Sequence, residues 1–368
     1  MKTVDRKQKS IRSKPVKRRD RTLAAFDGQD REQLISLVCN QFCKGLRVSQ
    51  ILAALKQEHG VDLTREQPYE ILRWAAENGR LQYLAPLESE LSHRILEDHS
   101  WLKRARVVRS AEANDVALQA AKLLAEIIRK WKSPELHVGF AGGGLMAETV
   151  RLLTGLLRTP EEMPVKRLIV HSLVAAAYDP RRSPNSFLQW FLDPDLPFET
   201  TFVGLPAPGV VSSETLRALR RIEGIAEAFD RAHEIDIVVT SAGAHWDKGC
   251  SALHGLYEQM AQPENLRALT EAGCIGDILW QPVNSAGQIE LGAGVRAVTV
   301  LDLPALRQLA DAGKHVVLVL APCGSCRGPK QEILGAVLRW EGAITDLVVD
   351  SRTAVEFFRS VRPGGAAS

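Results

Sequence analysis

The stretch that decides the fold is HVVLVLAPCGSCRGPKQEILGAVLRWEGAITDLVVDSRTAVEFF, residues 315–358. It opens with an unbroken apolar run over 315–320, which is typical of a short strand buried on both faces. A loop rich in Pro, Gly and Cys follows, and then an apolar stripe at helical spacing over 328–340. A second apolar run, 346–349, leads into a second helical pattern over 351–359. This order of elements indicates a parallel α/β sheet.

The same alternation of strand and helix patterns extends upstream. Further strand-like runs occur at 136–140, 166–172, 200–204, 235–240 and 295–300. Helical patterns separate them, at 211–221 and 302–312, and a long amphipathic helix precedes them over 112–131. We therefore expect residues 111–368 to form one parallel α/β domain with helices on both faces of the sheet.

The N-terminal part differs, because three short helical patterns follow one another, each closed by a glycine. They lie within 31–45, 47–60 and 63–79, and the alternating segment RLQYLAP, 80–86, predicts a wing strand. Short helices joined by tight turns are typical of a helix-turn-helix module, although a three-helix dimerisation domain has the same pattern. In a DNA-binding module the third helix would present four side chains to DNA: Arg65, Gln67, Tyr69 and Arg73.

A strongly basic arm precedes these helices. Residues 1–22 hold ten Lys or Arg, among them Lys17, Arg18 and Arg19, against two Asp, which gives a charge of +8. The whole chain carries only +3, so the remaining residues are acidic at −5. A basic arm on an acidic body indicates contact with a polyanion such as DNA, and a solvated tail is the alternative.

Composition excludes several classes of protein. The chain has 368 residues, 45% hydrophobic and 25% charged, which is typical of a globular protein with room for two domains. No apolar run is long enough to predict a membrane span or a secretory signal. Six cysteines at irregular spacing do not form a disulfide framework. These features predict a cytoplasmic protein.

Four loops at the carboxyl ends of predicted strands carry the candidate ligand chemistry. In the first, Gly142, Gly143 and Gly144 stand between a strand and a helix. Their backbone can approach an anion closely, and the helix N-terminus adds free N–H groups. The loop is not a nucleotide-binding fingerprint. It predicts a phosphate or sugar site, with a tight packing turn as the alternative.

The next two loops add polar groups. Gly243, Ala244 and His245 follow the strand 235–240, and a metal site there is disfavoured because the spacing of His and Cys matches no familiar zinc pattern. Asp277 stands at a turn, where its carboxylate could accept hydrogen bonds from a polyol or from its own backbone.

The fourth loop holds Lys330 and the pair Cys323 and Cys326. A lysine in the first turn of a helix opposes the helix dipole, so it is better explained by a bound anion than by the helix itself. A solvated surface lysine is the alternative. The two cysteines could form a redox or metal site, but they stand apart from the predicted helix start and no second pair exists. We expect them to be incidental.

Together these blocks resemble the SorC/DeoR-type sugar-responsive transcriptional regulators over roughly 30–360. The resemblance rests on the helix-turn-helix pattern, on HVGFAGGG, DIVVTSAG, LTEAGCIGDI and NSAGQI, and above all on the block 315–358. It implies a winged helix-turn-helix domain followed by an α/β effector domain of the ribose-phosphate isomerase/CoA transferase-like type. The expected domains are a basic disordered arm, a helix-turn-helix domain, a linker and an effector domain, at 1–29, 30–86, 87–110 and 111–368.

The resemblance also implies the function and the site. The effector would be a phosphorylated sugar or a similar metabolite, bound by Gly142, Gly143, Gly144, Gly243, Asp277 and Lys330. From their place in the second loop we also expect Ala244 and His245 near the ligand. We expect a DNA-binding regulator that is a homo-oligomer, without a cofactor, a metal or a membrane partner, and not an enzyme. Two alternatives stay open. One is a phosphosugar isomerase-like enzyme with Asp277 as general base, assisted by His245 and Lys330. The other is a redox- or metal-sensing regulator that uses Cys323 and Cys326.

Overall fold

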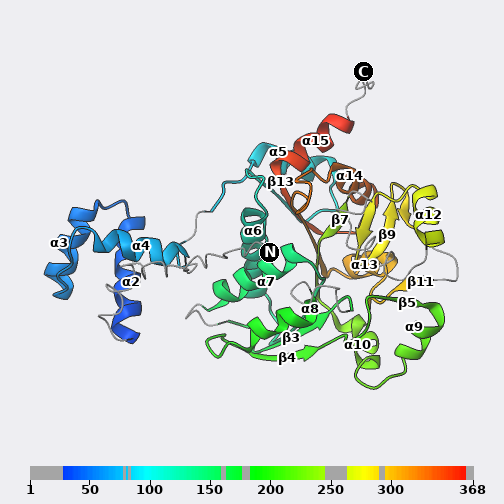
Figure 1. Cartoon of the computed structure of the whole chain (residues 1–368), viewed down its shortest axis with the longest axis horizontal. Helices are drawn as coiled ribbons and strands as arrows, with labels where there is room; N and C mark the ends of the chain where they lie inside the picture. The colour runs from blue at the N-terminus through cyan, green and yellow to red at the C-terminus, as the bar shows by residue number, and fades with distance from the viewer. Residues whose placement is uncertain are drawn as a thin grey trace, which may run out of the picture. The chain divides into compact units, whose positions relative to one another are not determined.

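The computed structural model of the chain describes residues 28–77, 80–81, 84–158, 163–175, 183–244, 263–289 and 295–361. It divides into two compact units, Met1–Tyr83 and Leu84–Ser368. In Figure 1 the helices of the first unit are blue, and the helices and strands of the second run from cyan to red. The basic arm, with Lys17, Arg18 and Arg19, lies outside the described residues, as does His245.

The first unit contains the three predicted helices. They are α2 (Gly28–Cys43), α3 (Val48–His59) and α4 (Gln67–Glu77). Gly60 ends α3 with a φ of 66°, the left-handed conformation that favours glycine. One apolar core holds the helices together, made of Leu34, Ile35, Val38, Ile51, Leu55, Ile71, Leu72 and Ala75. The wing strand predicted over 80–86 includes residues 82–83, outside the described part of the chain, and its other residues form no strand.

The second unit is built on a seven-stranded sheet in the order β1-β13-β12-β6-β2-β3-β4. Every neighbouring pair of strands is parallel. The strands are β1 (Arg104–Val108), β2 (Glu135–Phe140), β3 (Arg167–Ser172), β4 (Glu199–Val203), β6 (Ile237–Thr240), β12 (His315–Leu320) and β13 (Asp346–Asp350). The parallel sheet that the sequence predicts is confirmed.

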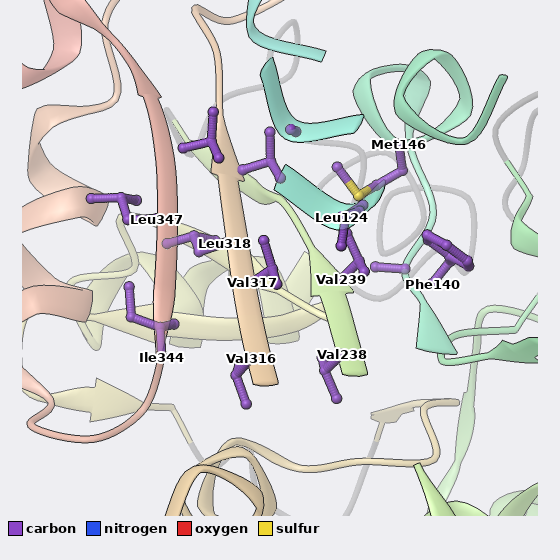
Figure 2. Close-up of a cluster of buried hydrophobic side chains, with 14 of the residues drawn as sticks. Leu124, Phe140, Met146, Val238, Val239, Val316, Val317, Leu318, Ile344 and Leu347 are labelled. Atoms are coloured by element: carbon purple, nitrogen blue, oxygen red, sulfur yellow. The ribbon is translucent and has the colours of Figure 1, made fainter. Parts of the chain in front are cut away.

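Both faces of this sheet are covered. Every residue of β6 and β13 is buried, which is possible only when helices or other segments cover each face. Figure 2 shows apolar side chains of β6, β12 and β13 packed together with Leu124 and Met146. The helices of this unit are α5 (Ser89–Asp98), α6 (Ala113–Arg129), α7 (Gly144–Leu157), α8 (Pro184–Phe187), α9 (Ser213–Leu219), α10 (Ala226–Asp230), α12 (Pro263–Glu271), α13 (Leu303–Asp311), α14 (Gln331–Arg339) and α15 (Ser351–Val361).

The strand order reverses at the centre of the sheet. From β2 the chain continues outward to β3 and β4, whereas from β6 it continues in the opposite direction to β12 and β13. The two central strands β2 and β6 are neighbours, with Val138 opposite Ile237. Ligands of open α/β sheets bind outside the carboxyl ends of the strands at such a reversal. The topology therefore points to the loops after β2 and β6.

Two smaller sheets flank the large one. The first is antiparallel and consists of β7 (Ala242–Ala244), β8 (Gly276–Ile278), β9 (Gln281–Asn284) and β10 (Gly287–Gln288). The second pairs β5 (Val210–Ser212) with β11 (Val295–Ala297) in antiparallel fashion. The run 295–300, expected in the parallel sheet, therefore lies outside it. Its Val298 is buried in a separate apolar cluster, which explains the apolar sequence.

Residues 87–110, which were expected to form a linker, belong to the α/β unit instead. They form α5 and β1, and β1 is an edge strand of the large sheet. Charged side chains conceal the strand in the sequence, because Arg104 and Arg106 alternate with buried residues. Arg104 Nε donates to Asp346 Oδ1 across 2.6 Å, and Arg106 is paired with Glu126.

Candidate ligand-binding site

A cavity of about 370 Å³ lies where the loops after β2, β6 and β12 meet. All four predicted loops line it. Six of the eight expected ligand residues line the cavity: Gly142, Gly143, Gly144, Gly243, Asp277 and Lys330. Ala244 is buried in β7 and does not line the cavity. The structure therefore brings together residues that are up to 188 positions apart in the chain.

The glycine loop forms the start of α7. Gly143 is the residue before the helix and has a φ of 113°, a conformation that L side chains rarely adopt. The first N–H groups of a helix have no partner within it, and the helix dipole gives this end a partial positive charge. Because Gly144 and Leu145 line the cavity, this end of α7 is suited to an anion.

Opposite the glycine loop, β7 and β8 approach each other closely. Gly243 is directly opposite Asp277 in the antiparallel pair. A Cβ at position 243 would lie 2.1 Å from Asp277 Oδ1, and one at Gly276 would lie 2.0 Å from the main-chain oxygen of Gly243. Neither position has room for a side chain, so the two glycines allow the Asp277 carboxylate to sit against the wall of the cavity.

One carboxylate oxygen of Asp277 accepts no hydrogen bond from the described residues. Its side chain is half-buried, but Oδ1 is fully buried and has no hydrogen-bond partner among the described residues. Burial raises the pKa of Asp277 to about 6, although the positive charge of Lys330 and the backbone N–H of Trp280 oppose the shift. At neutral pH the group is still mostly a carboxylate. A hydroxyl group of a ligand could donate to Oδ1 and satisfy it.

Lys330 is held from two sides. Its Nζ donates to the main-chain oxygen of Ala242 across 2.7 Å, and its backbone N–H donates to Thr353 Oγ1 across 3.1 Å. Thr353 in turn donates to the buried carboxylate of Asp350 across 2.6 Å. Burial lowers the pKa of Lys330, against the attraction of Cys323 and of the carboxylates of Asp277 and Asp350. An ammonium group has three donors, so one bond to Ala242 leaves donors for a ligand.

One wall of the cavity, the turn between β8 and β9, was not predicted from the sequence. Its two central residues, Leu279 and Trp280, are buried and left-handed, with φ values of 51° and 64°. This is the two-residue hairpin geometry that usually selects Asn-Gly, and bulky residues adopt it at a cost. The turn could not be predicted because the signal for it, a glycine or asparagine, is missing. Both side chains line the cavity.

The two cysteines have different surroundings. Cys323 is buried and lines the cavity beside Lys330, whereas Cys326 is exposed and does not. Both are free thiols. Within the described ranges, no cluster of three or more His, Cys, Asp or Glu side chains could hold a metal ion. Cys323 therefore belongs to the wall of this site.

In the N-terminal unit the expected DNA-contacting residues lie at the start of α4. Arg65, Tyr69 and Arg73 are exposed, and their spacing of four residues places Tyr69 and Arg73 on one face of the helix. The side chain of Gln67 already makes one hydrogen bond within the unit, because its Oε1 accepts the backbone N–H of Thr64 across 2.7 Å. That bond is half of a capping box and fixes the start of the helix.

A comparison with protein families identifies the larger unit. The sequence model of the Sugar-bind family, described as "Putative sugar-binding domain", matches residues 87–358, about three quarters of the chain. The chain belongs to the Sugar-bind family. The matched range begins at α5 and includes β1, which agrees with the place of both elements in the domain. Among curated proteins, none matches the chain.

Solved structures show the same fold as this Sugar-bind protein. A DeoR family transcriptional regulator from Listeria monocytogenes superposes with a TM-score of 0.55 at 20% identity, over 73% of this chain and 98% of that one. The full-length sorbitol operon regulator SorC from Klebsiella pneumoniae superposes with a TM-score of 0.61 at 15% identity, over 88% and 98%. A transcriptional regulator from Streptococcus pneumoniae gives 0.55 at 15% identity, over 74% and 97%.

These matches confirm the resemblance to the SorC/DeoR type and the fold class predicted for the chain. The match to SorC extends to 88% of this chain, whereas the other two cover about the length of the α/β unit. None of the described helices has the length and the hydrophobicity needed to cross a membrane.

Proposed function

We propose that this Sugar-bind protein is a transcriptional regulator whose α/β unit binds a phosphorylated sugar or sugar-like effector. The observation that carries the proposal is the pairing of two chemistries in one cavity. The start of α7 and the ammonium of Lys330 suit an anion, and the buried Oδ1 of Asp277 requires a donor. A phosphorylated polyol offers both groups in one molecule.

DNA binding is the second half of the proposal. The N-terminal unit is a compact set of three short helices, and α4 presents Tyr69 and Arg73 to solvent. The solved structures that share the fold are named as transcriptional regulators. Arg65 and Arg73 would contact phosphates or base edges, and the basic arm with Lys17, Arg18 and Arg19 would add affinity that depends on salt.

The regulator would act as a homo-oligomer in the cytoplasm, because helix-turn-helix proteins read two half-sites through a two-fold axis. The effector would favour one arrangement of the oligomer over another. A coupling free energy of about 1–3 kcal/mol between effector and DNA would be enough to switch binding. Whether the effector releases the protein from DNA or strengthens the complex decides if it induces or represses.

The effector half is tested by thermal denaturation of the full chain with a panel of free and phosphorylated sugars. A ligand at about 100 times its dissociation constant should stabilise the protein by about 2.7 kcal/mol. We expect a phosphorylated sugar to raise the midpoint, and its unphosphorylated form to do so less. A panel in which no sugar produces a shift would remove the proposal for this cavity.

The DNA half is tested by fluorescence anisotropy with DNA from upstream of its own gene and with scrambled DNA of equal length. Arg73→Ala is expected to weaken binding to the upstream DNA, and Glu77→Ala, at the end of the same helix, serves as the control. A protein that binds both DNAs equally, with and without the effector, would not be a sequence-specific regulator.

A second function keeps one observation in its favour. A carboxyl group with a pKa of about 6 beside a partly buried lysine is suited to general base catalysis, and Asp277 has this environment. The enzyme would be a phosphosugar isomerase-like protein. Turnover of a phosphosugar that is abolished by Asp277→Asn would establish it, and binding without turnover would favour the regulator.

A further inference from the structure

A second cavity, of about 320 Å³, lies on the other side of the wall that closes the first. Neighbouring residues divide between the two cavities. Asp277 and Ser241 line the first, whereas the next residue in β8, Ile278, and the preceding residue in β6, Thr240, line the second. The second cavity is bordered by α13, by the C-terminal half of α14 and by the turn between β9 and β10.

The interior of the second cavity is apolar. Its buried wall is formed by Ile278, Leu303, Leu306, Leu318, Val337 and Ile344. An apolar cavity of about 150 Å³ is large enough to take a benzene molecule. The second cavity therefore has room for a phenyl ring or a branched aliphatic group together with a short polar chain.

Three polar groups on the wall are not used by the fold. Trp340 lines the cavity, and its indole Nε1 is buried without a hydrogen-bond partner among the described residues. Arg307 and Glu341 also line it and are exposed, and neither takes part in an ion pair within the described ranges. The guanidinium group of Arg307 lies near Gly342, since a Cβ there would be 3.8 Å from Arg307 Nε, and Asp311 Oδ1 lies 3.8 Å from the same point. The two opposite charges therefore stand at the same edge of the cavity.

From these contacts we propose that the second cavity binds a zwitterion with an apolar side chain, that is, a hydrophobic α-amino acid. The side chain would occupy the apolar interior. The carboxylate would face Arg307 and accept from Trp340 Nε1, and the ammonium group would face Glu341. A ligand with only one of the two charges would leave the opposite rim charge without a partner.

The test uses three probes that share one phenyl ring and one chain length. They are L-phenylalanine, 3-phenylpropionate, which lacks the ammonium group, and 2-phenylethylamine, which lacks the carboxylate. Binding to the full chain is measured by titration calorimetry. L-phenylalanine is expected to bind more tightly than either relative by about two- to five-fold, the usual size of one exposed ion pair.

Variants then assign each charge to its partner. Glu341→Gln should remove the advantage of L-phenylalanine over 3-phenylpropionate, and Arg307→Gln should remove its advantage over 2-phenylethylamine. Trp340→Phe keeps an aromatic ring but removes the indole N–H donor. It should weaken the binding of L-phenylalanine and of 3-phenylpropionate, the two probes with a carboxylate. The controls are Glu271→Gln and Arg267→Gln, which change exposed charges on α12, outside the cavity wall.

Ala343→Leu, which places a larger side chain at the cavity wall, should abolish binding of all three probes. The charge variants keep the test valid if this variant does not fold. The proposal is overturned if no probe binds saturably to the folded protein, or if the order of the probes is the same in the Arg307 and Glu341 variants. It is also overturned if Ala343→Leu separates an oligomer into monomers while wild type binds no probe, because the cavity would then be a subunit interface.

Discussion

The ammonium group of Lys330 is bonded to the main-chain oxygen of Ala242 across 2.7 Å. This bond connects the start of α14 to the strand that follows β6, so Lys330 closes the cavity between two loops that are far apart in the chain. The same residue is the only cation among the described lining residues. Its removal should therefore affect ligand binding much more than folding.

Lys330→Met keeps the length of the side chain and removes its charge. We expect the thermal shift produced by a phosphorylated sugar to disappear. The unfolding free energy should change by only about 1 kcal/mol, because the cost of burying the ammonium group offsets the lost hydrogen bond.

A matched control for this prediction is Lys314→Met. Lys314 Nζ also donates to main-chain oxygens, those of His233 and Ile235, at 2.8 and 2.7 Å, but it lies outside the cavity wall. It should bind the sugar like wild type. Equal loss of the shift in both variants would contradict a ligand role for Lys330.

Asp277→Asn should stabilise the protein in the absence of ligand at neutral pH. The pKa of Asp277 is about 6 in the folded state against 3.8 in the reference state, so the folded protein holds a proton that the unfolded chain has released. The contribution of this group to stability is present below pH 3.8 and is lost as the pH rises through 6. The variant should gain about 1–3 kcal/mol at pH 7 and bind effector more weakly.

Denaturation by urea between pH 4 and pH 8 would measure this effect. Asp346→Asn is the comparison, because hydrogen bonds from His315 and Thr345 and the charge of Arg104 lower the pKa of the Asp346 carboxyl group in spite of its burial. That variant should lose stability instead of gaining it. Two variants with the same sign would show that the unmade bond of Asp277 is not what distinguishes it.

Gly243→Ala should damage the site directly. The added Cβ would lie 2.1 Å from Asp277 Oδ1, so the carboxylate or the strand must move. Loss of effector binding is expected, with destabilisation of about 1–3 kcal/mol. Gly155→Ala, at an exposed position in α7 with no atom within 4 Å of the new Cβ, should stabilise by about 0.5–1 kcal/mol and leave binding unchanged.

His171 should make the protein sensitive to acid. It is buried on β3, with Nε2 2.9 Å from Nδ1 of His137, and burial together with His137 lowers its pKa to about 3. Since the unfolded chain takes up a proton near pH 6.5 and the folded protein does not, the stability due to this group is full above pH 6.5. It is lost toward pH 3, by about 1.4 kcal/mol per pH unit.

A pH series of urea denaturation curves for His171→Gln should show a shallower slope between pH 6.5 and pH 3. His93→Gln, an exposed histidine on α5, should keep the slope of wild type. A slope that survives in the His171 variant would assign the acid sensitivity to another group.

The sequence predicts those parts of the fold in which one apolar run makes one element. The five strands β2, β3, β6, β12 and β13 are apolar runs because both of their faces are buried, whereas the edge strand β4 buries only Val203. The strand β1 was not predicted, because Arg104 and Arg106 interrupt its apolar pattern. Their charges are paired with Asp346 and Glu126, which come near only in the folded chain. The sheet formed by β7 to β10 was not predicted, because strands of two to four residues are too short to give a recognisable pattern.

The candidate site divides in the same way. Gly142 and Lys330 could be proposed from sequence because each follows a recognisable strand, where parallel strands place their loops together. Asp277 was proposed from a turn pattern, but it lies inside the short strand β8. Cys323 and Trp280 could not, because nothing local distinguishes a cavity-lining thiol or indole from one in the core. Their role depends on which loops meet across the sheet.

The left-handed turn at Leu279 and Trp280 has a consequence for how the protein can change over generations. Asn-Gly in its place would relax the backbone, and a screen for heat resistance alone would favour that replacement. The same exchange would take away two side chains that close the cavity. Lineages selected for robustness and lineages selected for response to a metabolite should therefore diverge first at these two positions.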